Sequence, residues 1–327
     1  MNTRKQKAAL AIGLVLLLAG CTALMPGGDE TSVGLDYAPD ESVALIEVDP
    51  AIVEDEETLQ VLEATAPDEE SVEDEIQDEL AEAELDYDEL HSVVAFAQPN
   101  PDADEFESQE DAAVILDSDW DEEEFVDLAG EDASYEFVEQ EHAGHTMYAP
   151  DEEPEFGGAE YIGVIDDGVF VVGDQAAVES SLEVAADERD AVGGDLLDTY
   201  EDIRDDALIS VAVEFDEELV EGTPAAQDPQ QADLVDSLET GSVAYYSDSG
   251  NLGMEAQAHV DNEADAEDLN DMLSGWLVTY EQALGEENED LANQLDDVNV
   301  EQDGTTITVT WEGDVDTLVE ILEEERV

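Results

Sequence analysis

The stretch that decides the fold is Tyr161–Leu182, which reads YIGVIDDGVFVVGDQAAVESSL. Two apolar runs flank Asp-Asp-Gly at 166–168, and Asp-Gly between apolar runs predicts a β-hairpin, because a type I′ turn needs positive φ at both central positions. Asp174 is suited to cap a helix N-terminus. Apolar residues then recur at helical spacing, at Ala177, Val178 and Leu182. The stretch predicts a hairpin that leads into an amphipathic helix.

The same order recurs near the C-terminus, where Asp-Gly at 303–304 precedes Gly-Asp at 313–314. Around it, alternating apolar residues over 252–260 predict a strand, and apolar spacing over 269–284 predicts a long helix. We therefore expect an α+β protein with two lobes, each an antiparallel sheet with helices packed on one face. The repeated hairpin-then-helix order indicates duplication; turns of this kind are also common by chance.

Composition suggests where the lobes meet. Residues 222–231, GTPAAQDPQQ, carry little charge and contain two prolines, which is typical of a linker. The expected layout is a signal peptide over 1–20, a lipidated cysteine with a flexible tether over 21–41, an N-terminal lobe over 42–221, the linker, and a C-terminal lobe over 232–327.

The N-terminus has the features of an export signal. Three cations, at Arg4, Lys5 and Lys7, precede the apolar run Ala8–Leu18, and Leu-Ala-Gly-Cys follows at 18–21. Small residues before a cysteine suit a signal peptidase, and the Cys21 thiol can form a lipid thioether. Cys21 is the chain's single cysteine, so the fold has no internal disulfide.

Two other readings of the leader stay open: a chance thiol beside a cleavage site, and an uncleaved anchor over Ala8–Met25. Each reading places the acidic part outside the cell, tethered to the membrane. The Leu18–Cys21 motif and the hairpin-then-helix unit of Tyr161–Leu182 resemble exported lipid-anchored proteins of haloarchaea and related domain-of-unknown-function families. This resemblance implies a location and an architecture, and it brings no activity with it.

The charge of the chain excludes several functions. The sequence has 327 residues with 95 Asp and Glu against 6 Lys and Arg, and without residues 1–20 the formal charge is −92, with no lysine. Binding of nucleic acid or of anionic membranes needs clustered cations, and Walker loops and Schiff-base enzymes need a lysine. The surface is expected to attract cations without specificity.

Such a charge is compatible with disorder or with a folded halophilic protein. The hydrophobic content of 42%, set in regular periods, favours a folded core. Molar salt shortens the Debye length to about 3 Å, which suppresses repulsion between surface carboxylates. We therefore expect a protein adapted to brine.

Candidate chemical sites are few. Carboxylate pairs are uninformative at this acid density. His142 and His145 are weak metal-ligand candidates, because Gly144 indicates a hairpin on which we expect residues i and i+3 to point to opposite faces. Neither a nucleophile elbow nor a dinucleotide fingerprint is present. Trp276, Tyr280 and Trp311 lie at core periods and are expected to pack inside.

Three functions remain open at this point. The first is a non-enzymatic surface protein, anchored through Cys21, that acts in envelope structure or binds another envelope component without a cofactor. The second is a lipid-anchored binding protein for a small solute or cation in a cleft between the lobes. The third is a secreted hydrolase that uses buried carboxylates.

Overall fold

The structure is a computed structural model that describes residues 33–65, 87–100, 110–132, 135–151, 160–215, 234, 237–284 and 297–325. Cys21, the predicted leader and the predicted linker 222–231 lie outside the described residues. The chain divides into two compact units, and among the described residues the first comprises 33–50 and 87–194 and the second 51–65 and 195–325. The mixed helix and antiparallel-sheet class predicted from the sequence is confirmed.

This division differs from the predicted lobes. The boundary falls between Gly194 and Asp195, ahead of the predicted linker, because the strand Ile209–Glu214 pairs with Leu238–Asp248 in the second unit. The low charge and prolines of 222–231 describe local composition, whereas unit membership follows from strand pairing that the local sequence does not display.

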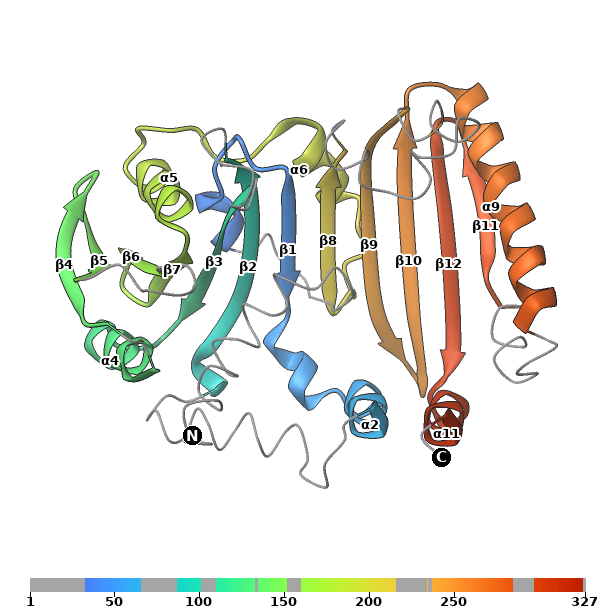
Figure 1. Ribbon diagram of the computed structural model, residues 1–327, viewed down its shortest axis with the longest axis horizontal. Helices are drawn as coiled ribbons and strands as arrows, with labels where there is room; N and C mark the ends of the chain where they lie inside the picture. Colours follow the sequence, from blue (N-terminus) through green and yellow to red (C-terminus); the bar gives the residue numbers. More distant parts are fainter. Residues whose placement is uncertain are drawn as a thin grey trace. The chain divides into compact units, whose positions relative to one another are not determined.

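Within its described residues, the first unit contains seven strands in the order β1-β2-β3-β7-β6-β5-β4, and all neighbours are antiparallel (Figure 1). The strand bounds are β1 (Ala44–Val48), β2 (Leu90–Pro99), β3 (Glu110–Ser118), β4 (Phe137–His142), β5 (His145–Pro150), β6 (Tyr161–Asp166) and β7 (Val169–Gly173). Its helical elements are η1 (Val33–Tyr37), η3 (Tyr87–Glu89), α4 (Glu122–Asp132) and α5 (Gln175–Ala185). The hairpin β6–β7 followed by α5 is the unit predicted from Tyr161–Leu182.

Helices cover both faces of this sheet, so the prediction of helices on one face is wrong for this unit. On α4, the Phe125 ring stacks on Phe170 of β7 with centroids 4.4 Å apart. On α5, Leu182 lies beside Gly163 of β6, and Val171 of β7 borders the same space. Since Phe170 and Val171 are neighbours on one strand, they point to opposite faces. Local periodicity identifies each helix but not the face it covers.

The described part of the second unit contains five strands in the order β8-β9-β10-β12-β11, again antiparallel throughout. The strand bounds are β8 (Ile209–Glu214), β9 (Leu238–Asp248), β10 (Asn251–Val260), β11 (Asn299–Asp303) and β12 (Thr306–Asp314). The helical elements are η2 (Pro50–Glu54), α2 (Glu56–Thr65), α6 (Gly194–Glu201), α9 (Glu263–Leu284) and α11 (Val315–Glu325). Figure 1 shows α9 running alongside β11 and β12.

Both faces are covered in the second unit as well. α9 buries Ala266 and Leu269 against Val260 and Ile307. α2 and α11 pack around Tyr245 of β9. The segment after α6 packs Ile203 and Ala207 against Ala244, which points to the face opposite its neighbour Tyr245.

Helix α2 belongs to the second unit because Asp55 fixes it there. One carboxylate oxygen of Asp55 accepts the Thr58 N–H at 2.8 Å, as an N-cap does, and the other accepts the Ser247 hydroxyl at 2.6 Å. The Thr58 hydroxyl lies 3.3 Å from the Tyr245 hydroxyl in the core, and burial raises the pKa of Tyr245 to about 12. A segment close to β1 in sequence is thereby held on β9.

The two units share a five-strand order. Strands β1-β2-β3-β7-β6 and β8-β9-β10-β12-β11 each follow the sequence order first, second, third, fifth, fourth, once the hairpin β4–β5 is set aside. A helix follows the third strand in each unit (α4 or α9), and another follows the fifth (α5 or α11). The first of these helices differs in placement, since α4 and α5 cover opposite faces whereas α9 and α11 share one.

Two local expectations are corrected. Only Gly168 has positive φ in the β6–β7 turn, so it is not type I′; the two positive φ values occur at Ala143-Gly144 and Ser249-Gly250 instead. On α9, Trp276 is 57% exposed. The buried side of the helix contains Ala266 and Leu269 and continues to the half-buried Leu273 and Leu277. Trp276 is one residue from Leu277, so its side chain points about 100° away from that side. Trp311 is half-buried, and the Tyr280 side chain lies outside the described part.

Candidate functional site

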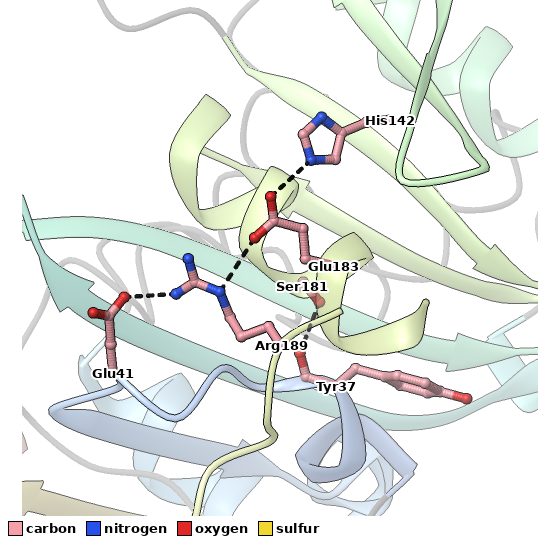
Figure 2. Close-up of polar contacts among 6 residues, drawn as sticks. All are labelled: Tyr37, Glu41, His142, Ser181, Glu183 and Arg189. Atoms are coloured by element: carbon pink, nitrogen blue, oxygen red, sulfur yellow. Dashed lines mark hydrogen bonds and ion pairs between the residues drawn. The ribbon is translucent and has the colours of Figure 1, made fainter. Parts of the chain in front are cut away.

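A polar cluster in the first unit centres on Glu183, near the C-terminal end of α5 (Figure 2). Its Oε1 lies 3.3 Å from Nε2 of His142, and its Oε2 accepts a hydrogen bond from Nε of Arg189 at 3.3 Å. The guanidinium of Arg189 also donates to Glu41 Oε2 through Nη1 at 2.6 Å. Four side chains from β4, α5 and two connecting segments thus form one chain of contacts.

The end of α5 explains how these residues meet. After the C-cap Ala186, Asp187 adopts a left-handed φ of 58°, which reverses the chain. The backbone N–H groups of Glu188 and Arg189 then both donate to the Glu183 carbonyl, at 2.8 and 3.2 Å. This fold-back places Arg189 against the last turn of the helix, where cations are favoured by the helix dipole.

Backbone pairing continues the cluster toward η1. Ser181 donates its hydroxyl to the Tyr37 carbonyl at 2.9 Å, and Pro39 forms an isolated antiparallel bridge with Ala191. The Val192 N–H donates to the Ala38 carbonyl at 2.8 Å. The cluster therefore ties the segment after η1 to the segment after α5.

Electrostatics keep Arg189 charged. Partial burial alone would lower the pKa of Arg189, but hydrogen bonds and charge from Glu41 and Glu183 outweigh it and raise the pKa above its ordinary value. Its side chain is 26% exposed, whereas Glu41 is 68% exposed. In a chain with so few cations, this arginine is committed to a structural contact.

The arrangement lacks the contacts of a nucleophilic site. An activated serine needs a base within hydrogen-bond reach. The Ser181 hydroxyl is fully buried and directed to the Tyr37 carbonyl, while His142 is directed to Glu183. The contacts of these groups connect α5 to β4 and to the segment after η1.

The two candidate metal ligands lie on one face, contrary to expectation. The hairpin predicted at Gly144 is confirmed as β4–β5, and His142 pairs directly with His145. Residues directly opposite on antiparallel strands share a face, so the inference that positions i and i+3 point apart is wrong for a two-residue turn. Among the described residues, no group of three or more His, Cys, Asp or Glu is placed to hold a metal ion.

The second unit holds the other described arginine, Arg204. Its Nε and Nη2 donate to the two carboxylate oxygens of Asp206 at 2.6 and 2.9 Å. The guanidinium carbon also lies 3.2 Å from the ring centroid of Tyr246, whose hydroxyl donates to Glu312 at 3.1 Å. Bidentate pairing and cation–π contact make this arginine structural too.

Sequence reasoning did not single out Glu183, Arg189 or Arg204. The available signal was scarcity: after the first seven residues the chain has three cations, all arginine. Arginine rather than lysine suits fixed bidentate and stacked contacts, and both described arginines make such contacts.

Replacement of Glu183 is expected to cost more stability than replacement of Glu41. Glu183→Gln weakens contacts to two partners at a site 32% exposed, so we expect a loss of about 1–2 kcal/mol. Glu41→Gln removes one contact at a largely exposed carboxylate, with a loss below about 0.5 kcal/mol. Urea unfolding in molar salt measures both, and equal losses would contradict the central role of Glu183.

Comparison with known proteins identifies neither a family nor a function for this chain. No family model matches the chain, and no curated protein matches it. Solved structures of TP0453 in crystal forms IV, III and I give TM-scores of 0.48, 0.46 and 0.46 at 7%, 6% and 8% identity. These alignments cover 90% of this chain in each case, and 97%, 99% and 98% of the TP0453 chains. At these values the likeness carries no inference about function.

Within the described residues, none of the helices combines the length and apolarity needed to cross a membrane.

Proposed function

We propose that this protein is exported, anchored by lipid on Cys21, and acts on the outside of a brine-exposed cell as a non-enzymatic structural or interaction module of the envelope. The observation that carries the proposal is the order of basic residues, the apolar run Ala8–Leu18 and Leu-Ala-Gly-Cys at 18–21. The large excess of acids after this leader supports adaptation to concentrated salt.

The polar contacts support the non-enzymatic part of this proposal. His142, Glu183 and Arg189 are held in a chain of contacts that joins segments, and Ser181 is held by a backbone carbonyl. Arg204 is held by Asp206 and Tyr246. Polar groups fixed in this way rigidify a scaffold, which suits a protein whose partner is another envelope component.

We also infer that the two units descend from one duplicated α+β module. The shared five-strand order, with a helix after the third and after the fifth strand, supports this inference. The hairpin β4–β5 is then an insertion in the first copy.

Cys21→Ser is expected to release the protein into the medium or to leave it as unprocessed precursor. Without the thiol no thioether forms, and each methylene of a lost acyl chain removes about 0.8 kcal/mol of membrane affinity. Fractionation of cells followed by intact mass measurement reads the outcome. Thr22→Ser, which keeps the thiol, is the matched control and should stay membrane-bound at the mature lipidated mass.

A Cys21→Ser protein that remained on the membrane at the mature size would rule out lipid as the anchor. The interaction role is tested separately by crosslinking intact cells in molar salt and identifying captured proteins by mass spectrometry. We expect a recurrent envelope component with wild type and its loss with Cys21→Ser. Wild-type protein that captured nothing recurrent would contradict the interaction role.

A further inference from the structure

The second half of α9 carries no charge. Between Asp271 and Glu281 the sequence reads MLSGWLVTY, which is the longest uncharged run in any helix that the structure describes. The first half of the same helix reads EADAEDLND and is rich in acids. In a chain with 95 acidic residues among 327, an uncharged helical run on the surface needs a physical reason.

Burial does not supply that reason. Trp276 and Val278 are 57% and 52% exposed. Three small residues beside them are also exposed, at Ser274, Gly275 and Thr279. Successive residues of a helix are turned by about 100°, so these five positions form one continuous arc on the helix surface. We call this arc the neutral face of α9.

Gly275 is an independent sign that something approaches this face. Glycine in the interior of a helix is destabilising relative to alanine. Gly275 does not have a positive φ, and a Cβ there would meet nothing within 4 Å among the described residues. Neither the backbone conformation nor the packing of this part of the chain therefore requires glycine. Glycine also allows close approach of another backbone, which fits a second helix packed across the neutral face.

The charge of the chain indicates what the second helix is. A symmetric dimer brings the same patch of two copies together. On the first half of α9, such a contact would set Glu267 and Asp268 against carboxylates of the other copy, and like charges oppose association. On the neutral face two copies meet without that repulsion. A membrane fits less well, because helices that lie on lipid surfaces are rich in Lys and Arg on their polar face, and α9 contains neither.

We propose that the neutral face of α9 is a dimer contact between two copies of this chain, with the two helices antiparallel and crossing at Gly275. Trp276 of each copy then packs beside the crossing, and Trp is enriched among the residues that dominate binding at interfaces. A rise of 1.5 Å per residue places the two copies of Asp271 about 12 Å apart along the helix axis. That separation exceeds the Debye length of about 3 Å in molar salt.

A contact of this size is weak. Stable interfaces bury about 800 Å² on each partner, and roughly two and a half turns of one helix offer less. We therefore expect a dissociation constant on the order of 10–100 µM, so that the dimer forms where copies are concentrated. The contact does not depend on Cys21, so failure of this proposal or of the lipid anchor leaves the other standing.

Disulfide crosslinking of the purified full-length protein in molar KCl tests the contact. Ser274→Cys places a thiol beside the crossing, roughly 3 Å along the helix axis from the same thiol of the other copy. With copper phenanthroline as oxidant, we expect a crosslinked dimer at about 100 µM protein and little at about 1 µM. Wild-type protein, whose single cysteine is Cys21, gives the background.

Glu267→Cys is the matched control. It places an exposed thiol on the same helix outside the neutral face, about 24 Å along the axis from its counterpart, and should give only background. Gly275→Leu, added to Ser274→Cys, separates the contact from the stability of the fold. Leucine has open space there and favours the helix, so the thermal midpoint should stay or rise. Its bulk blocks the crossing, so the rate of dimer formation should fall about tenfold or more.

Three results would overturn the proposal. The first is an equal yield of dimer from Ser274→Cys and Glu267→Cys, and the second is an unchanged rate with Gly275→Leu. The third is a Ser274→Cys protein that stays monomeric at about 100 µM. In that case, a blue shift of tryptophan emission with phosphatidylcholine vesicles, lost in Trp276→Phe, would assign the neutral face to a lipid surface instead.

Discussion

Dialysis from molar to millimolar salt will unfold this protein, and return to molar salt will refold it. The sequence carries 95 acids against 6 Lys and Arg, and the described arginines are already paired with carboxylates. At about 0.01 M salt the Debye length reaches about 30 Å, so most carboxylates repel one another across the molecule. We expect repulsion on that scale to exceed the net stability of about 5–15 kcal/mol that ordinary domains have.

Far-ultraviolet circular dichroism follows this transition directly. Several alkali salts should refold the protein once they screen charge, whereas sucrose at low salt should not, since it leaves the repulsion in place. Native spectra at millimolar salt would show that the acidic surface needs no screening.

Gly168→Ala is expected to be the most damaging single substitution among the glycines of the hairpin turns. Gly168 has φ of 78°, and a Cβ there would lie 2.0 Å from the Ser118 carbonyl oxygen. The Gly168 carbonyl also accepts hydrogen bonds from the Ser118 N–H and hydroxyl, at 3.0 and 2.9 Å. We expect a loss of about 3–5 kcal/mol, from left-handed strain and from displacement of these buried bonds.

Gly304→Ala is the matched comparison. Gly304 lies in the turn between β11 and β12, which hold the same places in the shared five-strand order as β6 and β7, the strands on either side of Gly168. Gly304 has φ of 62° with nothing within 4 Å of a Cβ, so only the backbone strain of about 1–2 kcal/mol applies. Urea unfolding in molar salt, monitored for each unit, gives both values. Equal losses would mean that the contact with Ser118 carries no energy.

Local patterns predicted several of the elements. The hairpin and helix of Tyr161–Leu182, the alternating strand that became β10 and the long helix α9 all appear where periodicity places them. Their signals need only neighbouring residues, since side-chain direction repeats every two residues in a strand and every 3.6 in a helix. The error at Trp276 arose because one step along a helix turns a side chain by about 100°, from the buried to the exposed side.

The candidate site was harder to predict. The sequence indicates the pair His142 and His145, but not its geometry, because a two-residue turn places its flanking residues opposite each other on one face. Glu183 was one acid among 95, and its role depends on Arg189 folding back after Asp187 and on His142 arriving from β4.

The sequence by itself determined the class of elements, the hairpin-then-helix repetition, the acidity and the expectation of an exported, anchored chain. Tertiary structure decided that β3 lies between β2 and β7, that α2 packs on β9, and that helices cover both faces of each sheet. The physical reason is the distance along the chain over which each effect acts. Backbone propensity and side-chain period act between near neighbours, whereas strand partners and helix faces are selected by the apolar area buried between segments far apart in the chain.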